Sequence, residues 1–176
     1  MVRTRRVPQT GLRIEAAMES PHRVLVRSLD RPTSSQTLRL DMPELLGGTN
    51  RGLMPLEALI AAYAGSLNVV GNFVAKTMDF AIRGCTFTIW AEFDPRGIYG
   101  LAKTDKAIKV VHVEARVATT ESSARLAQLR KATTERCPVH HLLRSAGVRI
   151  KEDWQCVAPG NSRAKAASKP KSKTKQ

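Results

Sequence analysis

Residues 55–79 read PLEALIAAYAGSLNVVGNFVAKTMD, and this stretch decides the fold. Its apolar residues recur at steps of three and four, the spacing of one face of an α-helix. Alanines, Val69 and Phe73 fill much of the remaining surface. Pro55 suits the first helical position, where a backbone N–H has no helical partner. Because a helix that is apolar nearly all round is typical of a protein interior, we predict a long buried central helix here.

Strand patterns lie on both sides of this helix. Residues 23–27, Arg-Val-Leu-Val-Arg, indicate a short strand, and residues 37–40 are a candidate hairpin partner. Residues 85–93 alternate with period two, and so do residues 111–117. Residues 94–97, Asp-Pro-Arg-Gly, are typical of the turn that joins two such strands.

Two more helices are predicted towards the C-terminus. A capping hydroxyl and an acid within residues 120–123 indicate a helix start, and the helix runs to about Arg136. Cys137-Pro138 ends it, because a residue before proline avoids the helical conformation. Pro138 then opens a short helix to Leu143, and residues 148–150 form a last strand. This order predicts an α+β fold with antiparallel sheets packed around the central helix.

Length and charge indicate one folded domain with two basic ends. We predict a basic N-terminal arm over residues 1–13, a domain over 14–158, and a disordered Lys-rich tail over 159–176. Ten of the 29 basic residues lie in these ends, which leaves 19 against 15 acids in the body. The tail lacks aromatic residues for base stacking, so we expect only weak, non-specific contact with nucleic acid.

The expected environment is the cytoplasm. No apolar region follows the basic residues at the N-terminus, which argues against a secretory signal. No stretch is expected to reach the apolar length that crosses a bilayer, so no membrane contact is predicted. The three cysteines are unpatterned in spacing, which fits reduced thiols better than a disulfide framework.

With these elements assigned, several motifs resemble the OsmC/Ohr family, the osmotically inducible and organic hydroperoxide resistance proteins. Residues 43–48 and 55–62 are similar to that family's loop and helix entry. Residues 92–97 match its following strand and turn, and residues 134–140 match its second cysteine with the Pro-Val that follows. The likeness covers roughly residues 40–155 in the family's order and spacing, so the set is specific although each piece is not.

The resemblance implies an OsmC-like fold in an intertwined homodimer, with active sites at the subunit interface. It also implies thiol chemistry, in which a reactive cysteine reduces a hydroperoxide and the second cysteine resolves the sulfenic acid as a disulfide. Here Ser66 stands where the family has its attacking cysteine. The organic hydroperoxide branch has a glutamate directly after the helix-opening proline, whereas this chain has Leu56 there and Glu57 one residue later.

These departures leave two hypotheses. In the first, the chain is an oxidative-stress redox protein with impaired peroxidase activity, and thiol chemistry rests on Cys137, which begins a helix where a thiolate is favoured. In the second, it is a non-catalytic dimer that keeps the interface pocket for a small apolar ligand.

The candidate catalytic residues are Cys137 and Ser66, although Cys137 could simply pack and Ser66 could simply bond back to its helix. The candidate ligand-binding residues are Glu57, Tyr63 and Asn68. A hydroperoxide or an apolar molecule is the expected ligand, and neither a metal nor a cofactor is expected.

Overall fold

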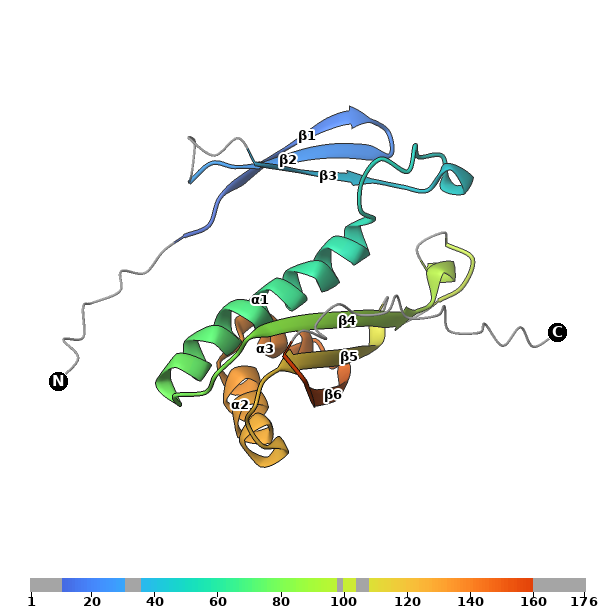
Figure 1. The fold of residues 1–176 in the computed structure, drawn as a ribbon. Coiled ribbons are helices and arrows are strands. Elements are labelled where there is room, and N and C mark those ends of the chain that lie inside the picture. The colour runs from blue at the N-terminus through green and yellow to red at the C-terminus, as the bar shows by residue number, and fades with distance from the viewer. Residues whose placement is uncertain (1–10, 31–35, 98–99, 104–107, 160–176) are drawn as a thin grey trace. The chain divides into compact units, whose positions relative to one another are not determined.

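The computed structural model describes residues 11–30, 36–97, 100–103 and 108–159 (Figure 1). The predicted N-terminal arm and Lys-rich tail lie almost entirely outside these residues. The chain divides into two compact units, Met1–Leu59 and Ile60–Gln176, and each contains one three-stranded sheet. The architecture is mixed α+β, as the sequence predicts.

The N-terminal unit is an antiparallel sheet of β1 (Ile14–Ser20), β2 (Arg23–Ser28) and β3 (Thr37–Asp41). The pairing of β2 with β3 confirms the predicted hairpin, whereas the sequence did not indicate β1. The register places apolar residues from all three strands on one face: Ile14, Ala16, Met18, Val24, Val26, Leu38 and Leu40. Ion pairs also link the three strands: Glu15 of β1 pairs with Arg27 of β2, and Glu19 of β1 pairs with Arg23 of β2 and with Arg39 of β3.

A buried carboxylate organises the loop after β3. The side chain of Asp41 accepts hydrogen bonds from Thr49 Oγ1 at 2.5 Å and from the backbone N–H of Arg51 at 3.0 Å. These hydrogen bonds hold the pKa of Asp41 well below its usual value, and the bond from the Thr49 hydroxyl has the largest effect. A Cβ at Gly48 would lie 1.8 Å from the carbonyl oxygen of Met42, so the close approach of the backbone requires glycine there.

The predicted central helix is α1 (Pro55–Thr77). It buries one side, formed by Tyr63, Leu67, Gly71, Val74 and Ala75. The sequence predicted that the whole helix would be buried. In the single chain it is not: the side chains of Val69 and Phe73 are 54% and 68% exposed. By length and composition α1 could also cross a membrane, so the expectation that no stretch reaches that length was wrong. The core helix of a soluble protein meets the same criteria of length and composition. The buried side of α1 packs against the apolar core of the second unit.

The second unit contains β4 (Gly84–Phe93), β5 (Ile108–Ala118) and β6 (Arg149–Val157). β4 pairs antiparallel with β5, as predicted, but β6 runs parallel to β5, so this sheet is mixed rather than purely antiparallel. A parallel neighbour needs a crossover connection, and two helices supply it: α2 (Ser123–Arg136) and α3 (Pro138–Ser145). Side chains from α1, α2 and one face of the sheet form the core, with Val74, Val117, Leu126 and Leu129 fully buried.

The helix ends follow the sequence signals closely. Ser122 caps α2 by accepting a hydrogen bond from the backbone N–H of Arg125. The guanidinium of Arg125 donates to the carbonyl oxygens of Met78 and Asp79 at 2.9 and 3.0 Å, just beyond the last residue of α1. α2 therefore holds the end of α1 in place.

Candidate functional site

The candidate site lies where α1 meets the start of α3. Ser66 Oγ lies 3.1 Å from Cys137 Sγ, and Tyr63 Oη lies 2.8 Å from His140 Nδ1. Tyr63 and Ser66 lie three positions apart on one face of α1, about one turn apart. Their partners are Cys137, the N-cap of α3, and His140 in its first turn. The two helices are thus joined by two side-chain hydrogen bonds, one stacked above the other.

Local sequence places Cys137 at this junction. Pro138 occupies the first position of α3, and Cys137 is extended, with φ −77° and ψ 113°, between the two helices. Its sulfur caps α3 by accepting a hydrogen bond from the backbone N–H of His140 at 3.4 Å. Cys137 is fully buried, and its sulfur is the hydrogen-bond partner of the Ser66 hydroxyl. The sulfur therefore sits between the Ser66 side chain and the first turn of α3.

The neighbouring Tyr63–His140 pair is held neutral by its surroundings. Tyr63 is fully buried, and burial, followed by electrostatic interaction with the Glu152 and Cys137 side chains, raises the pKa of its phenol. Burial lowers the pKa of His140, and the positive charges of His141 and Arg144 lower it further. The tautomer of the imidazole decides which of the two groups, the phenol or Nδ1, donates the hydrogen of this bond.

Sequence reasoning missed Glu152, a buried acid on β6. Its register places it beside Val113 on the covered face of the sheet, and its side chain is only 11% exposed. Burial raises its pKa, while Arg130 at 3.6 Å and the indole N–H of Trp154 at 3.4 Å partly oppose that rise. The alternation of Ile150, Glu152, Trp154 and Cys156 is the signal that could have found it.

Two of the predicted ligand-binding residues are engaged elsewhere. Glu57 accepts a hydrogen bond from the backbone N–H of Met54 at 2.9 Å, so its carboxylate caps the start of α1. Asn68 is exposed, and its carbonyl oxygen accepts a hydrogen bond from the side chain of Asn72. The structure therefore brings Ser66, Cys137 and Tyr63 together, whereas Asn68 takes no part in the hydrogen bonds between α1 and the start of α3.

The other thiols belong to the core. All three cysteines are free, and both Cys85 and Cys156 pack against the apolar core. Burial raises the pKa of Cys85 to about 11, so this thiol stays protonated at neutral pH. The imidazole of His141 bonds the carbonyl oxygen of Glu135 at 2.8 Å, whereas His140 bonds Tyr63. The two adjacent histidines thus have different partners.

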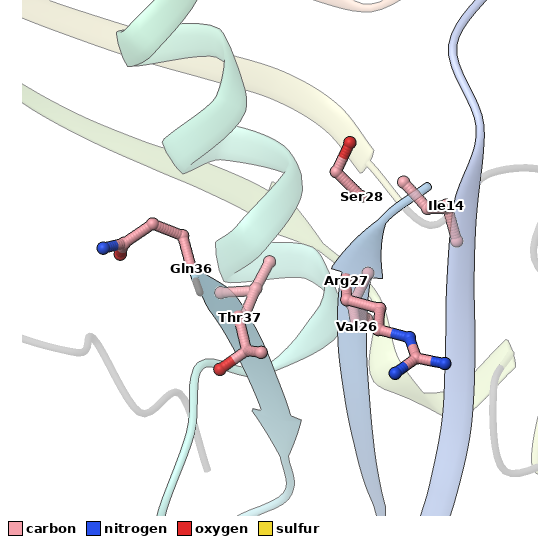
Figure 2. A pocket seen from close by; sticks show the side chains of 7 residues that line it. Ile14, Val26, Arg27, Ser28, Gln36 and Thr37 are labelled. Carbon is pink, nitrogen blue, oxygen red and sulfur yellow. The ribbon is translucent and has the colours of Figure 1, made fainter. Parts of the chain in front are cut away.

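The N-terminal sheet carries two hollows. One, of about 330 Å³, is lined by residues of all three strands and by Gln36 (Figure 2). Its charged lining residue, Arg27, is paired with Glu15. The other, of about 540 Å³, covers the apolar face and is lined by Ile14, Ala16, Pro21, His22, Val24, Val26, Leu38, Leu40, Met42 and Pro55. The second hollow is the more apolar of the two and suits an apolar occupant.

Comparisons with known proteins agree with this architecture. Residues 48–153 match the family model described as OsmC-like protein. The chain resembles an OsmC-like protein from Mycoplasma pneumoniae with a TM-score of 0.71 at 16% identity, covering 85% of this chain and 99% of that one. It also resembles an organic hydroperoxide resistance protein OsmC from Legionella pneumophila (TM-score 0.63, 20% identity, 84% and 98% covered).

A third similar structure is the organic hydroperoxide resistance protein OhrB of Bacillus subtilis, with a TM-score of 0.55, 21% identity and coverage of 83% and 98%. No match was found among curated protein sequences. The structural likenesses, all at low identity, establish the fold, and the family model covers more than half of the chain. The chain therefore belongs to the OsmC-like family.

Proposed function

We propose that this chain is an oxidative-stress redox protein with impaired peroxidase activity, whose remaining thiol chemistry rests on Cys137. The observation that carries the proposal is the 3.1 Å contact between Ser66 Oγ and Cys137 Sγ. A cysteine at position 66 would place a second sulfur against Cys137, in the arrangement that a resolving disulfide needs. Ser66 keeps that geometry without the sulfur.

The chemical consequence follows from the difference between oxygen and sulfur. Reduction of a hydroperoxide requires a thiolate that accepts an oxygen atom and becomes a sulfenic acid. A serine hydroxyl does not ionise near neutral pH and cannot be oxidised in this way. Cys137 remains as the thiol at the site, and its sulfur lies at the start of α3, where unpaired N–H groups favour negative charge.

The apolar surfaces of the chain support a homodimer. One side of α1 is exposed and combines small and large apolar residues: Ala61, Ala62, Gly65, Val69 and Phe73. The N-terminal sheet also exposes apolar residues, with Ile14 and Met18 at 61% and 76%. Surfaces of this kind are typical of subunit interfaces. We place the dimer in the cytoplasm, where free thiols persist.

A second candidate function is binding of a small apolar molecule without catalysis. The observation that favours it is the apolar hollow of about 540 Å³ on the N-terminal sheet, a volume within the range of small-molecule sites. Under this hypothesis Ser66 marks the loss of the peroxidase reaction, and the protein retains the family's capacity to hold a hydroperoxide-like or other apolar ligand.

Consumption of an organic hydroperoxide with a thiol reductant tests the first candidate. The native protein should consume it slowly, and Cys137→Ser should abolish that consumption, whereas Cys85→Ser should leave it unchanged. Equal consumption by the native protein and Cys137→Ser would refute the role of Cys137. A native protein that consumes none would leave binding as the function, which titration with apolar ligands would then measure.

A further inference from the structure

One side of α1 stays open in the single chain, and it carries no charge. The sequence from residue 58 to residue 75 contains neither an acid nor a base. The exposed residues of this stretch, which we call the open side of α1, are Ala61, Ala62, Gly65, Asn68, Val69, Asn72 and Phe73. An uncharged, mostly apolar helix side of this length is typical of a surface that a partner covers.

The residues of the open side change in size along the helix. Ala61, Ala62 and Gly65 of the first half are small, whereas Val69 and Phe73 of the second half are large and 54% and 68% exposed. Glycine is unfavourable inside a helix. A Cβ at Gly65 would meet no neighbouring atom of the described residues within 4 Å, so packing within the chain does not require glycine there. The close approach of a second backbone would explain it.

A surface that is small at one end and large at the other fits a second copy of itself when the two helices run in opposite directions. In a two-fold contact, a residue that meets a second residue is met by it in return. When Gly65 of each copy meets Val69 of the other, Ala62 meets Phe73, because each of the latter two lies about 5 Å further from the two-fold axis along its helix. The axis then passes near Asn68.

The charges at the two ends of α1 favour the same direction. Glu57 lies in the first turn and Lys76 in the last. An antiparallel pair brings the end with Glu57 to the end with Lys76 of the other copy, whereas a parallel pair brings like charges together. Asn72 Nδ2 donates to the backbone carbonyl oxygen of Asn68 at 2.8 Å. This bond within the helix lowers the cost of removing the two asparagines from water.

We propose that the open side of α1 binds the open side of α1 in a second copy of the chain, antiparallel, with the two-fold axis near Asn68. The inference rests on the homodimer of the proposed function and deepens it, because it assigns the direction and the register of the contact. A lipid surface also accepts an uncharged helix side, but it requires neither the small residues of the first half nor the asparagines.

Oxidative cross-linking of single cysteine variants tests the direction and the register. Asn68→Cys should give a disulfide-linked dimer as its main species, because the two copies of residue 68 lie side by side at the axis. Phe73→Cys is the matched control. Its two copies would lie about 18 Å apart along the helices, beyond the roughly 4.4–6.8 Å between Cα atoms that a disulfide spans. A mixture of Ala62→Cys and Phe73→Cys should form the mixed dimer, and the native protein gives the background from its own cysteines.

The possible outcomes separate the pairing from the rest of the proposed function. Phe73 is the most exposed large residue of the open side, so linking by random collision would make Phe73→Cys at least as reactive as Asn68→Cys and would overturn the proposal. A monomeric native protein in light scattering, or one that floats with vesicles of phosphatidylcholine and phosphatidylglycerol, would overturn it as well. Hydroperoxide consumption is measured separately, so an inert protein that links through residue 68 would refute the redox function and support the pairing.

Discussion

Thr133 of α2 offers a test of the packing between α2 and α1. The residue is fully buried, and no group of the described residues forms a hydrogen bond with its hydroxyl. A Cβ built at Gly71 would lie 3.7 Å from Thr133 Oγ1 and Cγ2, so the side chain faces α1 at that glycine. A buried hydroxyl without a partner costs about 1–3 kcal/mol of stability.

Thr133→Val should therefore stabilise the protein. Valine has nearly the same shape as threonine and a similar helix propensity, so removal of the unpaired hydroxyl is the main change. We expect the free energy of unfolding to rise by about 1–2 kcal/mol, which corresponds to a rise in Tm of roughly 2–8 °C for a chain of this size. Urea unfolding and calorimetry at matched protein concentration measure both quantities.

Thr134→Val is the matched control on the same helix. The hydroxyl of Thr134 donates to the carbonyl oxygen of Lys131 at 3.0 Å, so its removal should leave stability unchanged or slightly lower. If Thr133→Val lowers the stability as much as Thr134→Val or more, the Thr133 hydroxyl has a favourable partner and the reasoning is refuted.

Three further changes test other parts of the molecule. Arg125→Met removes two hydrogen bonds at the end of α1 and should cost about 1–2 kcal/mol in urea unfolding, with a smaller loss for Arg125→Lys; unchanged stability would contradict this capping role. The folded-state pKa of Asp41 lies below its unfolded value of about 3.9, so its stabilisation is present above that pH and lost as the pH falls through the folded value. Acid unfolding of Asp41→Asn should lack this component, and identical acid profiles would argue against it. Phe73→Lys should shift the proposed dimer to monomer in light scattering, whereas Lys76→Ala should not. If both variants have the same molar mass in solution, the exposed face of α1 is not part of the interface.

Local patterns predicted most of the second unit. The periodicity of residues 55–79 gave α1, which spans Pro55–Thr77, and the alternation of residues 85–93 gave β4, which spans Gly84–Phe93. Both signals depend on which side of an element faces the core, and one sequence carries that information. Turn residues and proline added the boundaries, including the break at Cys137.

Strands held by distant partners were harder to predict. Residues 14–20 contain Ala, Glu and Met, which favour helices, and they become β1 through pairing with β2. The last strand was predicted over residues 148–150 but extends to Val157, because parallel pairing with β5 outweighs the low strand propensity of its charged residues.

The site was only partly visible in the sequence. Family resemblance indicated Ser66 and Cys137, and the structure places them in contact. The bond between Tyr63 and His140 joins residues 77 positions apart, and no local pattern reports such a contact. Glu152 was missed for the same reason as the rest of β6. Tertiary structure, rather than composition, brings these groups to one place.

The most direct test of the central claim is the reaction of Ser66→Cys with one equivalent of an organic hydroperoxide. Free thiols are counted before and after, and mass spectrometry locates any disulfide. We predict that the variant loses two thiols and links the introduced cysteine to Cys137, whereas the native protein forms no such link. A Ser66→Cys variant that keeps all of its thiols, or a native protein that reduces the hydroperoxide equally fast, would contradict the claim that Ser66 occupies the place of the attacking cysteine.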